Sequence, residues 1–485
     1  NATTLTLGAG AGVTSTLTLG TGTIFNLGGN VTFSSATTPL AGLIQGGTLN
    51  LNGTRNVTTQ NIAADPDLTI QSVIADGSAS SGLTKAGGGS LLLSGNNTYT
   101  GVTTNNGGTL HVQGNSASIA ASIALVTNAA TITNIGAAAD TVAVNRLGDS
   151  AAITLDGGNA GGATLNYTGA DFASQAVHSE TAGALTVSGN HRSFLTLTPG
   201  SGDEVTLTFA SLARLDHATA LVRGSALGSA AGTAGSSRVF FASAPTLTGG
   251  IVPWLLVDAS ATGNGTGFAT YDATNGLRLL TAGEYTAPAS ATTGSNVLKS
   301  SAGNITVSSS VDVNSWTSAN TGTTTLGSGV TLGLQSGAVL FTSTGTLTGG
   351  TLAFANGSEG IIHLASGAAV TATVNSVITG SNGLTFSSTG AGNKILVLGG
   401  SNTFTGDLIL AAGGANYWLE SDGGTLHLAG LLPVSTPGGS RTLTLRGDSP
   451  IIVSGTIQDG TGGGTVSLSK SGTGTATLTS ANTFT

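Results

Sequence analysis

The chain has 485 residues, of which 78 are glycine and only 7% are charged, and its formal net charge at pH 7 is −8. So few charged side chains argue against long helices held by ion pairs, and the acidic balance excludes the basic surface that nucleic-acid binding requires. Cysteine and methionine are both absent, which is typical of a secreted protein stabilised by repetition rather than by disulfides.

Short alternations of apolar and polar residues recur about every eight to twelve residues and are separated by Gly or Asn. This period of two predicts β-strands, and the Gly and Asn residues between them tolerate the positive φ angles of tight corners. The alternations include Thr48–Leu51, Leu91–Ser94, Thr109–Val112, Ala184–Ser188, Glu204–Thr208 and Thr442–Leu445. The sequence therefore predicts an all-β protein.

One segment of the chain is repeated. Residues 83–100, LTKAGGGSLLLSGNNTYT, return without a gap at residues 468–485 as LSKSGTGTATLTSANTFT, and a looser copy lies at residues 383–406. The shift is 385 positions both from Lys85 to Lys470 and from Asn97 to Asn482. Repetition of this kind is typical of a solenoid, in which each unit packs on the next.

A β-sandwich would need non-repeating strands joined by hairpins, so the repeats favour a right-handed parallel β-helix that forms an elongated rod. At roughly 20 residues per coil and about 4.8 Å between coils, we expect about 24 coils and a rod of about 115 Å.

The repeat resembles the autotransporter-associated β-strand repeat of passenger regions in large secreted bacterial proteins. Residues 82–101 and the following residues 107–112 carry the resemblance. The matching positions, to which the resemblance implies a structural role, are Lys85, Leu91, Leu93, Asn97, Tyr99 and Gly101, then Asn402, Phe404 and Gly406, and finally Lys470, Asn482 and Phe484. In the looser copy Phe386 replaces the lysine, and a longer segment with Tyr417 and Trp418 predicts an outward loop.

The middle of the chain, residues 140–285, holds six of the nine arginines and eleven of the 21 acidic residues. It resembles the stretches between such repeats in long members of the same class. Beyond it the chain restarts, with residues 320–326 aligned to residues 1–7 and residues 349–352 aligned to residues 46–49. We expect the natural polypeptide to be longer at both ends.

Four segments follow from these alignments. We expect residues 1–112 to form a β-helix with the first repeat, and residues 113–319 to form a β-helical spacer with longer, more charged loops. Residues 320–428 would hold the second repeat module and residues 429–485 the third.

Two hypotheses address the charged middle segment. Asp203 and Glu204 with Arg192 or Arg214 could serve a β-helical polysaccharide lyase or hydrolase, since two carboxylates and a base assist proton abstraction or glycosidic cleavage. Adjacent residues of a strand point to opposite faces, however. We therefore favour loops whose Arg and Asp residues hold the corners of longer coils.

Other catalytic sequence patterns occur without the neighbouring residues that their chemistry requires. Ser150 and Ser449 each follow Gly-Asp, but Ala151 and Pro450 stand where a serine protease of the trypsin type has glycine. No two of the six histidines stand at metal-ligand spacing, and no glycine precedes a lysine as in a phosphate-binding loop. We expect no metal or cofactor.

The sequence thus predicts a structural or adhesive protein of the bacterial cell surface or extracellular space. We expect a rigid stalk or fibre subunit that acts by repeated weak contacts with glycans or with host or abiotic surfaces, or that assembles end to end into fibres. Contact with a membrane would need a C-terminal translocator or anchor that this chain does not contain. A carbohydrate-binding passenger domain is the alternative, with Trp254, Tyr271, Tyr417 and Trp418 as surface-binding candidates.

Overall fold

The computed structural model describes residues 4–9, 14–35, 40–142, 145–158, 162–171, 177–390, 394–406, 408–412, 416–420, 426–428, 432–433, 441–454, 456–459 and 465–484. These residues form an all-β structure with parallel strands, as the alternating sequence pattern predicts. Its helices, within this part of the chain, are the 3₁₀ turns η1 (Ala282–Glu284) and η2 (Pro288–Ser290).

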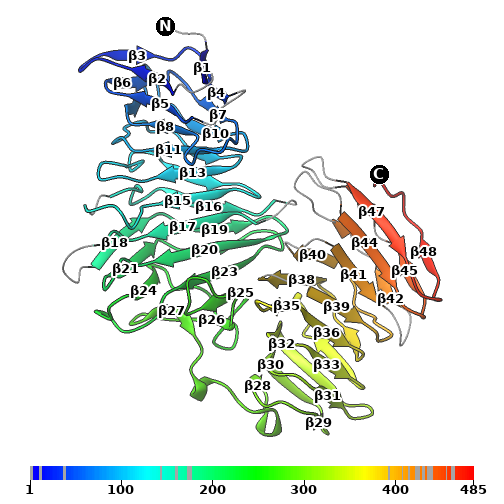
Figure 1. The fold of residues 1–485 in the computed structure, drawn as a ribbon. Helices are drawn as coiled ribbons and strands as arrows, with labels where there is room; N and C mark the ends of the chain where they lie inside the picture. Colours follow the sequence, from blue (N-terminus) through cyan, green and yellow to red (C-terminus); the bar gives the residue numbers. More distant parts are fainter. Residues whose placement is uncertain are drawn as a thin grey trace.

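The first half of the chain forms a stack of coils, in which each strand pairs with the strand one coil later (Figure 1). One sheet contains β1 (Leu5–Ala9), β4 (Val31–Ser35), β7 (Arg55–Thr59), β10 (Leu83–Ala86), β12 (Thr103–Asn105), β14 (Ala124–Thr127), β16 (Ala152–Asp156), β19 (Leu185–Ser188) and β22 (Leu212–Arg214).

The second sheet of this stack contains β2 (Ser15–Thr18), β5 (Gly42–Gln45), β8 (Leu68–Ile70), β11 (Ser90–Leu93), β13 (Thr109–Val112), β15 (Ile132–Ile135), β17 (Thr164–Thr168), β20 (Arg192–Thr198), β23 (Thr219–Gly224), β25 (Val252–Asp258), β26 (Gly267–Asp272) and β27 (Gly276–Leu279). Two three-stranded sheets flank it, namely β3 (Ile24–Asn26), β6 (Thr48–Asn50) and β9 (Val73–Ala75), and β18 (Val177–Ala182), β21 (Glu204–Phe209) and β24 (Ser237–Phe241).

A second stack begins after η2. One of its sheets contains β28 (Asn296–Lys299), β30 (Val311–Ser318), β32 (Thr331–Phe341), β34 (Thr351–Phe354), β35 (Gly360–Ala365), β37 (Val377–Thr379), β38 (Leu384–Thr389) and β40 (Leu408–Ala412). Another contains β29 (Ile305–Val307), β31 (Thr323–Leu326), β33 (Gly345–Thr348), β36 (Val370–Val374), β39 (Lys394–Leu398), β41 (Asn416–Glu420), β44 (Arg441–Arg446) and β47 (Val466–Lys470). Small sheets of β42 (Leu426–Leu428), β45 (Ile451–Val453) and β48 (Ala476–Leu478), and of β43 (Leu432–Pro433) and β46 (Ile457–Gln458), complete it.

Strand alternation places one hydrophobic core inside each stack. In β17 the apolar Leu165 and Tyr167 are buried and their neighbours are half-exposed, and β36 has the same pattern. Val, Leu and Ile side chains of successive coils thus lie above one another and exclude water along the stack axis. This arrangement is compatible with a parallel β-helix.

The expectation of one continuous elongated rod is wrong for this chain. The parallel ladder of the first stack ends at β25, with which β26 pairs in antiparallel fashion, as β27 does with β26, and a new ladder starts at β28. Figure 1 shows the two stacks joined at this end and diverging toward the two chain termini. An antiparallel pair turns the chain back on itself, so the next coil cannot continue along the same axis.

The expected coil length of about 20 residues is too short as a rule. Leu83 pairs with Thr103, 20 residues later, but Ile153 pairs with Leu185, 32 residues later. Longer coils mean fewer coils per residue, so the estimate of about 24 coils is too high. The extra residues lie at the corners, where they leave the ladder register unchanged.

The second stack has a corner equivalent to one in the first stack, but some of the corresponding residues differ from those that the sequence alignment predicted. Gly46 has φ +73°, and a Cβ there would overlap the Leu19 carbonyl oxygen; Gly349 has φ +72°, and a Cβ there would overlap the Leu326 carbonyl oxygen. The corner at residues 46–49 therefore does correspond to residues 349–352. In the preceding coil, however, Leu326 takes the place of Leu19. Residues 325–330 therefore correspond to residues 18–23, and residues 320–326 do not correspond to residues 1–7.

We predict that Gly46→Ala destabilises the first stack by about 2 kcal/mol more than Gly22→Ala. Both glycines have φ +73°, so both variants bear the cost of an alanine in left-handed backbone. Only Gly46 also faces a carbonyl of the previous coil, whereas nothing lies within 4 Å of a Cβ at Gly22. Urea unfolding followed by circular dichroism measures the difference, and equal losses in the two variants would contradict the proposed close approach of coils.

Candidate functional site

The repeated asparagine forms the same contact in all three copies. The Asn97 side-chain oxygen accepts the backbone N–H of Ile74 in the previous coil at 3.0 Å. Asn402 accepts from Ile378 at 2.8 Å, and Asn482 accepts from the backbone N–H of Ile457 at 2.8 Å. A carboxamide thus replaces the strand partner that the backbone lacks at this corner.

The threonine that follows each asparagine completes a second bond to the same residue. The backbone N–H groups of Thr98, Thr403 and Thr483 donate to the carbonyls of Ile74, Ile378 and Ile457 at 2.8, 2.9 and 3.0 Å. We call this pair of hydrogen bonds the corner clamp. It fixes both backbone polar groups of one isoleucine in the coil below.

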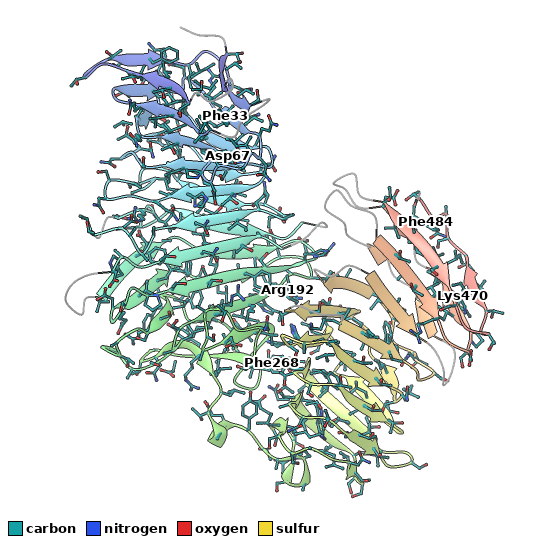
Figure 2. The ribbon with its side chains drawn as sticks, viewed as in Figure 1. Phe33, Asp67, Arg192, Phe268, Lys470 and Phe484 are labelled. Atoms are coloured by element: carbon teal, nitrogen blue, oxygen red, sulfur yellow. The ribbon has the colours of Figure 1, made fainter. Side chains whose placement is uncertain are left out.

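The aromatic residue two positions after the asparagine packs against the core. Tyr99 is 1% exposed, and its hydroxyl lies 2.7 Å from the Thr103 hydroxyl, while burial raises the pKa of Tyr99. Phe404 is buried as well, and Phe484 is half-buried on the last coil (Figure 2). Leu91 and Leu93 lie in the core with no exposed surface.

Glycine follows the threonine of the motif because two coils approach each other there. A Cβ at Gly101 would overlap the Ser81 carbonyl, and Gly406 has φ +94° beside Gly383.

The repeated lysine is buried without a carboxylate partner. The Lys85 ammonium donates to the carbonyls of Ala86 and Gly87 at 3.0 and 2.9 Å and to that of Gly107, in the next coil, at 2.6 Å. Burial lowers the pKa of Lys85 to about 8, against the charge of Asp67, which raises it. Lys470 donates in the same way to the carbonyls of Ser471 and Gly472, but its side chain is exposed.

Sequence analysis did not identify a further buried lysine whose ammonium donates to backbone carbonyls. Lys299 is 1% exposed and donates to the carbonyls of Ser301, Asn320 and Thr321. A signal was present, because Leu298-Lys299 is followed by small residues, as Lys85 and Lys470 are. The remaining lysine, Lys394, also donates to a carbonyl, that of Ala368.

Two of the residues proposed for a lyase or hydrolase, Glu204 and Arg214, pair with other residues and not with each other. Glu204 lies 3.4 Å from Arg238 and accepts the backbone N–H of Gly232, whereas Arg214 pairs with Glu359 of the second stack at 2.7 Å. Asp203 is buried. Arg192 is buried as well, with its guanidinium 4.5 Å from the centre of the Phe194 ring. Glu204 and Arg214 therefore belong to separate ion pairs.

The charged middle segment uses ion pairs at corners, as the favoured hypothesis expects. Arg146 and Asp140 are both buried and lie 2.7 Å apart. Arg278 binds Asp272 at 2.6 Å and Glu284 at 2.8 Å, which fixes the start of the segment that leads to the second stack. Contact with this arginine outweighs burial and holds the pKa of Glu284 at about 2.

Glu359 is the charged residue that sequence analysis overlooked. Its carboxylate accepts from Arg214 at 2.7 Å and from His217 at 2.9 Å, and both partners belong to the first stack. Burial by itself raises the pKa of Glu359, but the hydrogen bond from His217 and the charge and hydrogen bond of Arg214 lower it to about 2. More than 140 residues separate these groups in the chain, so no local pattern could reveal the cluster.

Among the described side chains, the aromatic residues proposed for surface binding do not form an exposed row. Trp254 is half-buried with the Arg214 guanidinium 5.9 Å from its ring, and the Tyr271 hydroxyl donates to the Phe241 carbonyl at 2.9 Å. The expected outward loop at Tyr417 and Trp418 is wrong, because both residues lie in β41, which pairs with β44 in the parallel ladder. Their side chains lie outside the described residues.

Among the described residues, no group of three His, Asp or Glu side chains could hold a metal ion. Across the same ranges, no helix combines the length and hydropathy needed to cross a bilayer.

Comparison with known proteins gives one partial similarity. No protein-family model matches the chain, and no solved structure matches it. A stretch of 93 residues is 44% identical to the adhesin BmaC autotransporter of Brucella suis biovar 1 (strain 1330). This stretch is 19% of the present chain and covers 2% of the length of that adhesin.

We predict that Asn97→Ala lowers the free energy of unfolding by about 1–3 kcal/mol, because the Ile74 N–H loses its acceptor inside the stack. Asn96→Ala is the matched control, since the neighbouring side chain is exposed. Chemical unfolding of both variants checks this prediction. Equal stability of the two variants would show that the corner clamp contributes nothing.

We predict a pH dependence that Lys85→Met removes. The folded-state pKa of about 8 lies below the ordinary 10.5, so between these values the unfolded chain binds more protons than the folded chain. The Lys85 contribution to stability therefore rises as pH increases from 8 to 10.5. Thermal unfolding midpoints across this range should rise more steeply in the natural chain and in Lys470→Met than in Lys85→Met, where Lys299, whose pKa burial also lowers, still contributes. A similar rise in all three proteins would contradict the assignment.

Proposed function

We propose that this chain is part of an adhesive, structural protein at the bacterial surface or outside the cell. In this proposal the coils form right-handed parallel β-helices that act as stiff arms. The observation that carries it is the corner clamp, which recurs in three copies of a motif resembling the autotransporter-associated repeat. The partial similarity to an autotransporter adhesin supports the same conclusion.

The mechanism is mechanical and multivalent. Each coil satisfies its backbone polar groups through its neighbours, so the arms keep their shape without disulfides. Outward-facing Thr, Ser and Asn side chains recur at each coil and offer hydroxyl and amide groups to glycans, to host or abiotic surfaces, or to sister chains. Contacts that are weak one at a time gain roughly 10²–10⁴-fold in avidity when many act together.

The four segments 1–112, 113–319, 320–428 and 429–485 remain a proposal for how repeat modules alternate with a charged spacer. A structural role of the twelve repeat-motif residues is likewise proposed. It is supported by the burial and backbone contacts of their described side chains.

We predict that beads coated with the chain adhere to surfaces in a density-dependent way. Beads carrying increasing amounts of the 485-residue chain are passed over mucin, glass and cell monolayers under flow, with albumin-coated beads as control. Multivalent contact predicts that retention on at least one surface rises more steeply than in proportion to coating density. Retention no greater than that of albumin at every density and on every surface would overturn the proposed adhesion.

A further inference from the structure

The two stacks meet along a seam formed by the outer faces of β35 and β38. All six residues of β35 and all six of β38 are buried, whereas β36 alternates between buried and half-exposed residues. One side of β35 and β38 faces the core of the second stack. The other side is covered by the first stack, where Leu256 and Phe268 form a shared apolar cluster with Leu340 and Ala365.

Polar contacts accompany this apolar cluster across the seam. Thr219 and Ser387 share a hydrogen bond of 2.8 Å between their hydroxyls, and the Thr389 hydroxyl donates to the Asn264 carbonyl. Glu359 binds Arg214 and His217, as described above. A seam that mixes apolar contacts with satisfied polar ones resembles interfaces between domains that separate reversibly.

His363 lies at the centre of the seam. It is 1% exposed, and on β35 it pairs with Leu340 on one side and Ser387 on the other. Its Nε2 lies 3.1 Å from the Pro253 carbonyl oxygen of the first stack and donates to it, and its ring packs edge-on against Phe268. Figure 2 shows Phe268 where the two stacks meet.

Protonation of His363 would be costly in this setting. The neutral ring satisfies Pro253 with one N–H, but the cation adds a second N–H at Nδ1 and a full charge between two cores. The charged groups nearest to it are Arg192 and Arg214 of the first stack and Glu359 of its own stack, with His217 bound to Glu359 and Lys394 near Arg192. Burial, with a further contribution from the charges of the two arginines, lowers the pKa of His363 to about 4, and the bond to Pro253 and the charge of Glu359 oppose this shift.

We propose that His363 is a proton-operated latch: the second stack is closed against the first at neutral pH and swings away from it in mild acid. The swing would occur between Glu284 and Thr286, because Arg278 holds Glu284 to the first stack and from Thr286 onward the chain already pairs with the second stack at Val297. Asn296 and Asn314, which bind the Gly249 carbonyl at the joined end, form the pivot.

The direction of the pH effect follows from the two states of the histidine. In the open state His363 meets water and has its ordinary pKa near 6.5, whereas in the closed state its pKa is about 4. The closed state therefore has its full stability relative to the open state above pH 6.5, and this stability decreases as pH falls toward 4. The closed-to-open ratio should fall by up to tenfold per pH unit, or roughly 300-fold over this window.

The Glu359 cluster acts against opening in the same range. Its carboxylate keeps its charge in mild acid because its pKa is held at about 2. A protonated His217 beside that carboxylate would strengthen the contact. Removing this cluster should therefore move opening to a higher pH, while removing the latch histidine should abolish it.

Distance measurements across the two arms test the latch. The chain has no cysteine, so Ala79→Cys and Ala476→Cys, both at exposed positions on different stacks, provide the labelling sites for spin-label distance measurements from pH 8 to pH 4. We expect the distance to lengthen between pH 6.5 and pH 4 in the doubly labelled chain. His363→Gln, which keeps an N–H donor for Pro253 but cannot be protonated, should stay closed throughout. His217→Gln, the matched histidine control, should open at the same or higher pH.

Two results would overturn the proposal: an unchanged distance down to pH 4 in the natural sequence, or opening of His363→Gln with the natural midpoint. Loss of the far-UV β-sheet signal together with the distance change would mean unfolding and would also overturn it. If His363→Gln does not fold, the titration of His363 is measured in the natural chain by imidazole hydrogen exchange. Its midpoint must then coincide with the distance change, and protonation without opening would reject the latch.

Discussion

Each coil of this protein depends on its neighbours for its backbone hydrogen bonds. A strand of three to six residues cannot bury its own polar groups, and in a parallel stack its N–H and C=O groups bond to the coils before and after it. Backbone groups at the corners lack such partners, because the chain turns there and the strand ladder is interrupted. The rest of the structure consists of ways to satisfy polar groups at those corners without adding bulk.

Two side-chain devices do this. The carboxamide of Asn97, and of its counterparts in the other two copies, occupies the place of a missing strand and closes on an isoleucine one coil away. Lys85 and Lys299 place an ammonium among main-chain carbonyls, which gives a buried cation three acceptors in place of a carboxylate. Both devices work over one coil spacing, so a motif of fewer than twenty residues can specify them and be copied along the chain.

The seam between the stacks is not built from contacts between successive coils. Nothing along the coil axis requires it, and it forms where the antiparallel pairs β25–β26 and β26–β27 end the first ladder and Arg278, held by Asp272, directs the chain into a new stack. Outer faces that would otherwise be hydrated become buried there, so their polar residues need partners from the other stack. His363 and Glu359 of the second stack both bind groups of the first stack there, which gives this regular protein a local sensitivity to charge.

The sequence by itself determined what repeats along the stack axis. Alternating Val, Leu and Thr residues predicted the strands, Gly46 and Gly349 marked equivalent corners, and the motif from Lys85 to Gly101 located residues that the structure buries, since all these features act between neighbouring coils. Tertiary structure alone decided the coil lengths, the end of the first ladder, and the pairing of Arg214 with Glu359 rather than with Glu204. The Arg214–Glu359 pair joins residues 145 positions apart, and the coil lengths and the end of the ladder depend on where an irregular corner turns the chain. A periodic pattern determines the spacing of coils but carries no information about which outer face a second stack will cover.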